Sequence, residues 1–84
     1  MLINMQKNII GPRIRQARLS SQPRLTQRQL AERVTSLGTR INRTGIAKIE
    51  IGIRYVYDYE ILPLAKALNV PLSRLLPWRR VVPR

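Results

Sequence analysis

The chain has 84 residues, of which 44% are hydrophobic, and its sixteen lysines and arginines outnumber its four aspartates and glutamates to give a formal net charge of +12. A chain of this length forms one small domain with one modest core, and its apolar content is too high for a disordered tail. The sequence contains no cysteine and no histidine. Their absence excludes disulfides, cysteine-ligated zinc and proton transfer by histidine, so we expect no enzyme, no metal and no other cofactor.

The excess of positive charge predicts a polyanionic partner, because a net charge so far from zero repels itself. Nucleic acid is the first candidate and an anionic membrane surface is the second. The sequence has no apolar run as long as a membrane span and no secretory signal pattern at its amino terminus. The lack of cysteine suits a reducing cytoplasm, which is where we expect the protein. Composition does not separate DNA from RNA as the partner.

The order of prolines and capping residues predicts an all-α domain of five short helices around one core. No stretch alternates polar and apolar residues over the length of a strand. We expect residues 1–8 to be a flexible segment, residues 9–77 to be the domain and residues 78–84 to be a basic tail.

The first helix is predicted to begin near Gly11-Pro12, because proline suits a first helical turn. Residues 20–24 interrupt the helical pattern. Thr26 followed by Gln29 then matches a capping box, which predicts the start of a second helix. The apolar side of this helix consists of Leu30, Ala31 and Val34.

Residues 35–41, which include Gly38, are expected to connect the second helix to a third. Asn42 is a good N-cap for the third helix, and Gly52 is suited to end it in the left-handed conformation. At helical spacing, Ile46, Ile49 and Glu50 point one way, and Arg43, Thr44 and Lys48 point away from them.

Asp58 precedes or caps a fourth helix, which Asn69 closes before Pro71 opens a short fifth helix. Pro63 lies in the first turns of the fourth helix and is expected to bend or fray its start. The apolar faces of these two helices are predicted to comprise Ile61, Leu62, Leu64, Ala65, Leu68, Leu72, Leu75 and Leu76. Leu75, Leu76 and Trp78 are also candidates for a dimer contact.

Two capped helices joined by a glycine-containing connection form a helix-turn-helix pattern. The sequence resembles the Cro/phage-repressor type of helix-turn-helix DNA-binding domain. Four segments carry the resemblance: "IRQAR", "LTQRQLAERV", "INRTGIAKIEIGIR" and "DYEILPLAKALNVPLSRLL". The resemblance as a whole covers roughly residues 10–77. The connection "TSLGTRI" is longer than the turn that is usual in the family.

The resemblance implies a structural ion pair between Arg18 and Glu50, because family members pair an arginine of the first helix with this glutamate. It also matches Arg43, Thr44 and Lys48 to the positions that contact bases. An arginine can donate two hydrogen bonds to guanine O6 and N7, so Arg43 is the best candidate to read a base. Gly45 either lets the helix backbone approach DNA closely or relieves crowding against the second helix.

The candidate phosphate-binding residues surround the third helix. By resemblance, Gln27 anchors a phosphate at the start of the second helix, and Arg54 lies in a loop that makes further phosphate contacts. Tyr55 and Tyr57 are both suited to donate a hydroxyl hydrogen bond to phosphate, and core packing is the alternative for one of them. The complete predicted set is Gln27, Arg28, Arg40, Asn42, Arg54 and Tyr55. Contacts to phosphate position a protein on DNA without reading its sequence.

These features predict a sequence-specific regulator of transcription that binds double-stranded DNA, with a repressor favoured, and inserts the helix from about Asn42 to Ile51 into the major groove. We expect a homodimer on DNA, a prokaryotic or phage origin, no membrane partner and no small-molecule ligand. The alternative is a small basic RNA-binding or ribosome-associated protein, although the aromatic residues form no stacking platform. The residues do not distinguish a repressor from an activator, an antitoxin-like regulator or a restriction-system controller.

Overall fold

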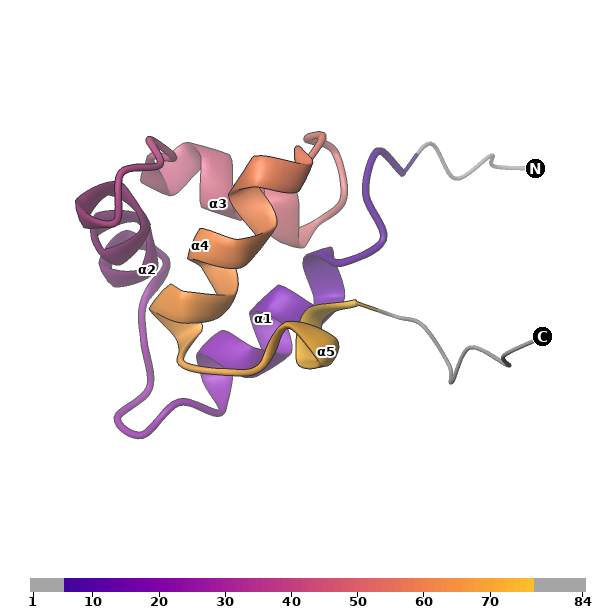
Figure 1. Ribbon diagram of the computed structural model, residues 1–84. Helices are drawn as coiled ribbons and strands as arrows, with labels where there is room; N and C mark the ends of the chain where they lie inside the picture. The colour runs from indigo at the N-terminus through magenta and orange to yellow at the C-terminus, as the bar shows by residue number, and fades with distance from the viewer. Residues whose placement is uncertain (1–5, 77–84) are drawn as a thin grey trace, which may run out of the picture.

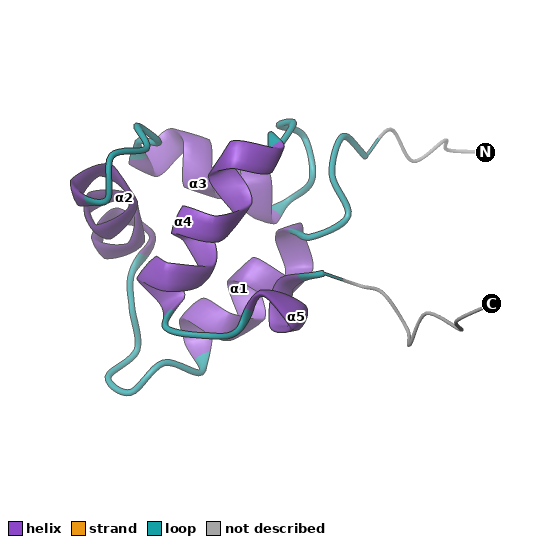
Figure 2. Ribbon diagram, in the orientation of Figure 1, coloured by secondary structure: helices purple, strands orange, loops and turns teal. Residues whose placement is uncertain are grey.

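The computed structural model describes residues 6–76, and within this range the chain forms five helices and no strand (Figure 2). The helices are α1 (Gly11–Leu19), α2 (Gln27–Ser36), α3 (Arg43–Glu50), α4 (Asp58–Leu68) and α5 (Leu72–Leu75). The predicted all-α class is therefore confirmed. Residues 1–5 and 77–84, which include Trp78 and the predicted basic tail, lie outside the described part of the chain.

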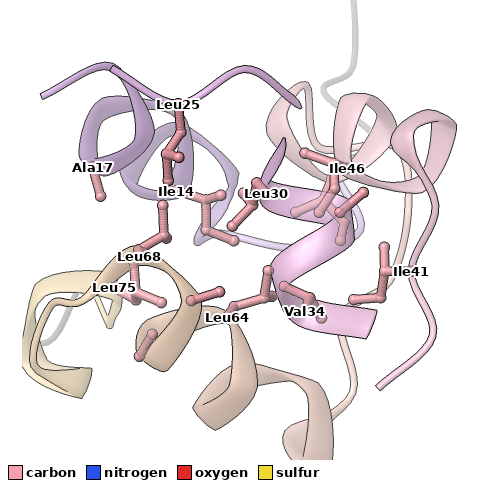
Figure 3. Close-up of a cluster of buried hydrophobic side chains, with 14 of the residues drawn as sticks. Ile14, Ala17, Leu25, Leu30, Val34, Ile41, Ile46, Leu64, Leu68 and Leu75 are labelled. Carbon is pink, nitrogen blue, oxygen red and sulfur yellow. The ribbon is translucent and has the colours of Figure 1, made fainter. Parts of the chain in front are cut away.

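The five helices surround a single core, with α4 crossing the middle of the molecule (Figure 1). The third helix packs against α1 and α2, and α4 packs against α1, α2 and α5. Each helix contributes at least one apolar side chain with no exposed surface, namely Ile14, Leu30, Ile46, Leu64 and Leu75 (Figure 3). Burial of apolar side chains is the dominant favourable contribution to the folding of such a domain.

The second helix begins at the predicted capping box. The Gln29 N–H donates to Thr26 Oγ1 at 3.0 Å, and the Thr26 N–H donates to Gln29 Oε1 at 2.8 Å. The helix ends at Ser36, two residues later than expected, so the connection to α3 spans only residues 37–42. The reason is that Gly38, with φ +98°, is the residue that turns the chain, and a helix continues up to the residues just before such a turn.

The third helix begins at Asn42, whose Oδ1 accepts a hydrogen bond from the Gly45 N–H at 2.7 Å, and ends before Gly52, which has φ +84°. Both ends were predicted. The Gly52 N–H donates to the Ile49 carbonyl and the Ile53 N–H donates to the Lys48 carbonyl, the pair of bonds expected of a glycine-terminated helix.

The predicted apolar face of α4 is wrong at Leu62, which is 55% exposed, while Glu60 occupies a buried position. Successive helical residues are rotated by about 100°, so Leu62 lies opposite Leu64, whereas Glu60 lies on the same side as Leu64. The helix continues through Pro63, because Leu64 and Leu68 beyond it are anchored in the core.

Residues 7 and 8, which the sequence assigns to a flexible segment, are hydrogen-bonded to the domain. The Lys7 N–H donates to the Gly52 carbonyl at 2.7 Å. Asn8 Nδ2 donates to the Ile49 carbonyl at 3.1 Å, and Asn8 Oδ1 accepts from the Gly11 N–H at 2.7 Å. Asn8 thus joins the start of α1 to the end of α3. No helix within residues 6–76 is both long and apolar enough to cross a membrane.

Candidate nucleic-acid interface

The third helix presents one buried and one exposed face. Ile46 and Ile49 are fully buried and Glu50 is 5% exposed, whereas the predicted base readers Arg43, Thr44 and Lys48 are all exposed. The apolar spacing of this eight-residue helix determines which face packs on α1 and α2. Three side chains able to donate hydrogen bonds consequently line its outer surface.

A buried ion pair holds α3 in place. Arg18 Nε donates to Glu50 Oε2 at 2.6 Å and Arg18 Nη2 donates to Glu50 Oε1 at 2.9 Å, while Arg18 Nη1 donates to the Leu25 carbonyl at 3.0 Å. Gln27 Nε2 adds a third bond to Glu50 Oε1 at 3.0 Å. Charge-assisted bidentate bonds of this kind offset the cost of burying both charges. Because Gln27 begins α2, Glu50 connects α3 to both of the helices on which it packs, α1 and α2.

One group of predicted residues gathers at the start of α3. Gln27, Arg28 and Arg43 line a common surface hollow of about 450 Å³, and Arg28, Asn42 and Arg43 line an adjoining one of about 410 Å³. Glu32 is the only carboxylate on either lining. The two hollows between α2 and α3 therefore have a cationic rim that suits an anion.

A second group gathers at the other end of α3. Lys48, Arg54 and Tyr55 line a hollow of about 350 Å³ together with Lys7 and Tyr57. The Lys7 Nζ lies 5.3 Å from the centre of the Tyr55 ring, which is within reach of a cation–π interaction. Tyr55 and Tyr57 are 58% and 54% exposed, so neither belongs to the core, and the core-packing alternative for one tyrosine is wrong. Tyr57 stacks on the exposed Tyr59 instead, with ring centres 5.7 Å apart.

Arg54 forms a second bidentate ion pair. Its Nη1 and Nη2 donate to Glu60 Oε1 and Oε2, both at 3.0 Å, and Nη1 also donates to the Tyr55 carbonyl at 2.8 Å. Burial raises the pKa of the Glu60 carboxyl, but hydrogen bonds from Arg54 and the Tyr57 N–H lower it by more, so this pKa lies below its ordinary value of 4.5. The hydrogen bond to Glu60 is the main cause that raises the pKa of Arg54.

Gly45 is required by crowding, although not against the second helix as one prediction held. A Cβ atom at this position would lie 2.9 Å from Ile41 Cγ2 and 3.3 Å from Asn42 Oδ1, both in the connection that precedes α3. It would also lie 3.6 Å from Arg54 Nε. The connection folds back over the first turn of α3, and only glycine leaves room for it.

Two predicted residues, Arg40 and Thr44, are less closely associated with the others. Arg40 is exposed in the connection between α2 and α3 but lines neither of the hollows at the start of α3. Every predicted nucleic-acid contact except Arg40 and Thr44 therefore belongs to one of the two groups of residues that line these hollows.

Sequence reasoning missed three residues that shape this surface: Arg24, Lys7, and Glu60 as a buried ion-pair partner. Glu60 carried a signal, since it is the third residue of α4 and its Oε1 accepts the Tyr57 N–H, as a capping-box glutamate does. Arg24 and Lys7 carried none, because only the fold brings them to these hollows.

A further, apolar hollow of about 440 Å³ shares Lys7 with the second of these groups. Ile9, Ile10, Val56, Ile61 and Leu76 form its apolar lining, and none of the predicted site residues lines it. The apolar surface beside α5 therefore adjoins the cationic surface around α3 at Lys7.

Among solved structures, the chain is similar to the restriction-modification controller protein C.AhdI from Aeromonas hydrophila. The two sequences are 30% identical, the TM-score is 0.67, and the similarity covers 80% of this chain and 87% of the controller chain. No protein-family model matches the chain, and no curated protein matches it.

Proposed function

We propose that this chain, which belongs to the helix-turn-helix family of the controller protein C.AhdI, binds double-stranded DNA as a sequence-specific regulator of transcription. In this proposal α3 enters the major groove, with its first turn closest to the base edges. The regulator is of the Cro/phage-repressor type, acts by occupying an operator, and is most simply a repressor.

The observation that carries the proposal is the two-faced character of α3. Its inner face is locked by Ile46, Ile49 and the Glu50 ion pair, and its outer face exposes Arg43, Thr44 and Lys48. A rigid helix with exposed donors is what direct readout of a groove requires. The formal charge of +12 supports a polyanionic partner for this face.

The proposed roles follow from side-chain chemistry. Arg43 donates to guanine, Lys48 reaches a base edge or a phosphate, and Thr44 bonds to either or places its methyl group against thymine. The proposed phosphate contacts are Gln27, Arg28, Arg40, Asn42 and Tyr55. For Gln27, which already donates to Glu50, the contact is proposed for the remaining amide hydrogen and for the backbone at the start of α2.

We also infer that the protein binds as a homodimer to a near-palindromic site, in the cytoplasm of the cell that produces it. A two-fold dimer places its two recognition helices one turn of DNA apart, about 34 Å. Its two-fold axis coincides with that of the near-palindromic site, so each helix meets one half-site. Dimer formation on DNA is measurable by analytical ultracentrifugation with a labelled duplex.

Selection of bound sequences from a random duplex pool tests the proposal. We expect one enriched motif with two-fold symmetry for the wild-type protein. Arg43→Ala should relax the preference at one position of each half-site, a loss of about 1–3 kcal/mol of discrimination, whereas Arg28→Ala should weaken all sequences alike. Structured RNA serves as the competitor. Tighter binding to RNA than to the selected duplex would favour the RNA-binding alternative, and equal, uniform losses in both variants would reject the role of Arg43.

A further inference from the structure

We propose that Arg54 is a positioning residue: through Glu60 it holds residues 54–57 beside α3, and it makes no contact with phosphate itself. This inference rests on the proposed function and replaces the phosphate contact expected for Arg54 from the sequence. It also assigns to Glu60, a residue with no predicted role, a part in DNA binding.

The first step is that the Arg54 guanidinium is already engaged. Both terminal nitrogens donate to the Glu60 carboxylate at 3.0 Å, and Nη1 donates to the Tyr55 carbonyl at 2.8 Å. The Glu60 side chain is only 4% exposed. Turning Arg54 towards a phosphate would leave that buried carboxylate without its cation, which is strongly unfavourable.

The second step is what the pair holds. Glu60 Oε1 accepts the Tyr57 N–H at 3.0 Å, and Asn8 Nδ2 donates to the Arg54 carbonyl at 2.8 Å. The backbone from Arg54 to Tyr57 is thereby bonded at three points, to α4 through Glu60, to the Arg54 side chain and to Asn8. This segment carries the exposed tyrosines that share a hollow with Lys48 of α3.

The third step is the position of Arg54 against α3. Arg54 Nε lies 3.6 Å from the point that a Cβ atom on Gly45 would occupy. The Arg54 side chain therefore lies beside the first turn of the recognition helix. Arg54 therefore touches α3, its own loop and α4 at once. The Arg54–Glu60 pair thereby sets the distance between the Lys48 amine and the hydroxyl groups of Tyr55 and Tyr57. In this proposal the amine and the two hydroxyl groups contact DNA.

Salt dependence of DNA affinity separates positioning from direct contact. A plot of the logarithm of the association constant against the logarithm of the salt concentration is a straight line with a negative slope. Each phosphate that the protein neutralises contributes about 0.9 to the magnitude of this slope. The full-length wild-type protein and its variants are titrated with NaCl on a duplex selected by the wild-type protein, at a temperature where circular dichroism shows each variant folded.

We expect Glu60→Gln and Arg54→Met each to weaken binding roughly tenfold, with the slope unchanged, and the double variant to be no weaker than either single variant. Arg28→Met, the control for a direct contact, should reduce the slope by about 0.9. In the Glu60→Gln protein, replacing Tyr55 and Tyr57 with phenylalanine should cost no further affinity, because their hydroxyl groups are already misplaced. Loss of stability alone would not produce this non-additivity.

The opposite result is equally clear. Glu60→Gln raises the net positive charge by one and releases Arg54, so a directly binding Arg54 would leave the affinity of this variant unchanged or tighter. That result, together with a slope reduced by about 0.9 in Arg54→Met, would overturn the positioning role while the proposed function stands. If Arg54→Met does not fold, Arg54→Met/Glu60→Leu, which leaves no buried charge unpaired, supplies the slope. Failure of the wild-type protein to bind any duplex would overturn both proposals.

Discussion

Gly11 shows at the scale of one residue how closely α3 is held. A Cβ atom there would collide with the Ile49 carbonyl oxygen and lie 3.0 Å from that of Glu50. Both atoms belong to the backbone at the end of α3, so neither can rotate away. The first turn of α1 rests directly on the last turn of α3, and glycine is the only residue that permits this contact.

Gly11→Ala should lower the free energy of unfolding by about 3 kcal/mol, since inserting a methyl group into a packed contact forces the backbone to shift. Gly38→Ala is the comparison, because Gly38 has φ +98° and no atom within 4 Å of a Cβ. Its cost, from backbone conformation alone, should be nearer 1 kcal/mol. Urea denaturation measures both; equal losses would show that the Gly11 contact is loose.

Arg18 and Glu50 make the second argument at this scale. Arg18→Met should reduce stability by about 3–5 kcal/mol, because it leaves the Glu50 carboxylate buried with only Gln27 as a donor. Arg18→Met/Glu50→Leu should recover part of the loss. The exposed Arg15 on the same helix is the control, and Arg15→Met should change stability by less than about 0.5 kcal/mol. A melting temperature equal to that of wild type in Arg18→Met would contradict the structural role of the pair.

The third helix illustrates how one element combines stability with function at a single residue. Asn42 caps α3 through its Oδ1 and remains exposed at the proposed phosphate-binding surface. The side-chain oxygen Oδ1 of Asn42 caps the helix, while the side-chain nitrogen Nδ2 is available to donate to a ligand. Substitutions that change one of these two groups separate the roles.

Asn42→Asp keeps the capping oxygen and adds a negative charge, which suits the start of a helix but repels phosphate. We expect stability within about 0.5 kcal/mol of wild type and DNA affinity reduced at least about tenfold. Asn42→Ala should instead lose about 1 kcal/mol of stability. Thermal melts and gel-shift titrations make the comparison. Unchanged affinity in Asn42→Asp would remove Asn42 from the interface.

The start of α4 is the other element with a separable role. The pKa of Glu60 is lower in the folded protein than in the unfolded chain, so its ionised form stabilises the fold above about pH 4.5, and this contribution is lost as pH falls through the lower folded-state pKa. The melting temperature of Glu60→Gln should therefore lie furthest below that of wild type near neutral pH, and the difference should shrink below about pH 4. The exposed Glu32→Gln is the control. A difference independent of pH would mean that the Arg54 pair contributes nothing through its charge.

At the scale of the whole molecule, the charge balance opposes folding and favours a partner. Two of the four carboxylates, Glu50 and Glu60, are buried in ion pairs, so few remain on the surface to compensate the excess of arginine. The surface consequently repels itself at low ionic strength. A polyanion relieves this repulsion as it binds.

Raising NaCl from about 20 mM to about 300 mM should raise the melting temperature of the free protein by several degrees and weaken its binding to duplex DNA, because salt screens repulsion and attraction alike. Neutralising two exposed charges of α1, in Arg13→Gln/Arg15→Gln, should reduce the salt effect on stability. Differential scanning calorimetry at the two salt concentrations measures it. A melting temperature that does not change with NaCl concentration would indicate that the surface charges are too far apart to repel one another.

The sequence by itself determined the number of helices, the caps of α2 and α3, and the exposed face of α3. Apolar spacing, the Thr26 capping box, Asn42 and Gly52 act within three or four residues, so local chemistry is enough to predict them. Apart from Arg18 and Glu50, whose pairing the family resemblance implied, only the tertiary structure decided which polar groups of different elements meet. It paired Arg54 with Glu60, bonded Gln27 to Glu50 and kept both tyrosines exposed, because such contacts depend on distances between elements that no local pattern specifies.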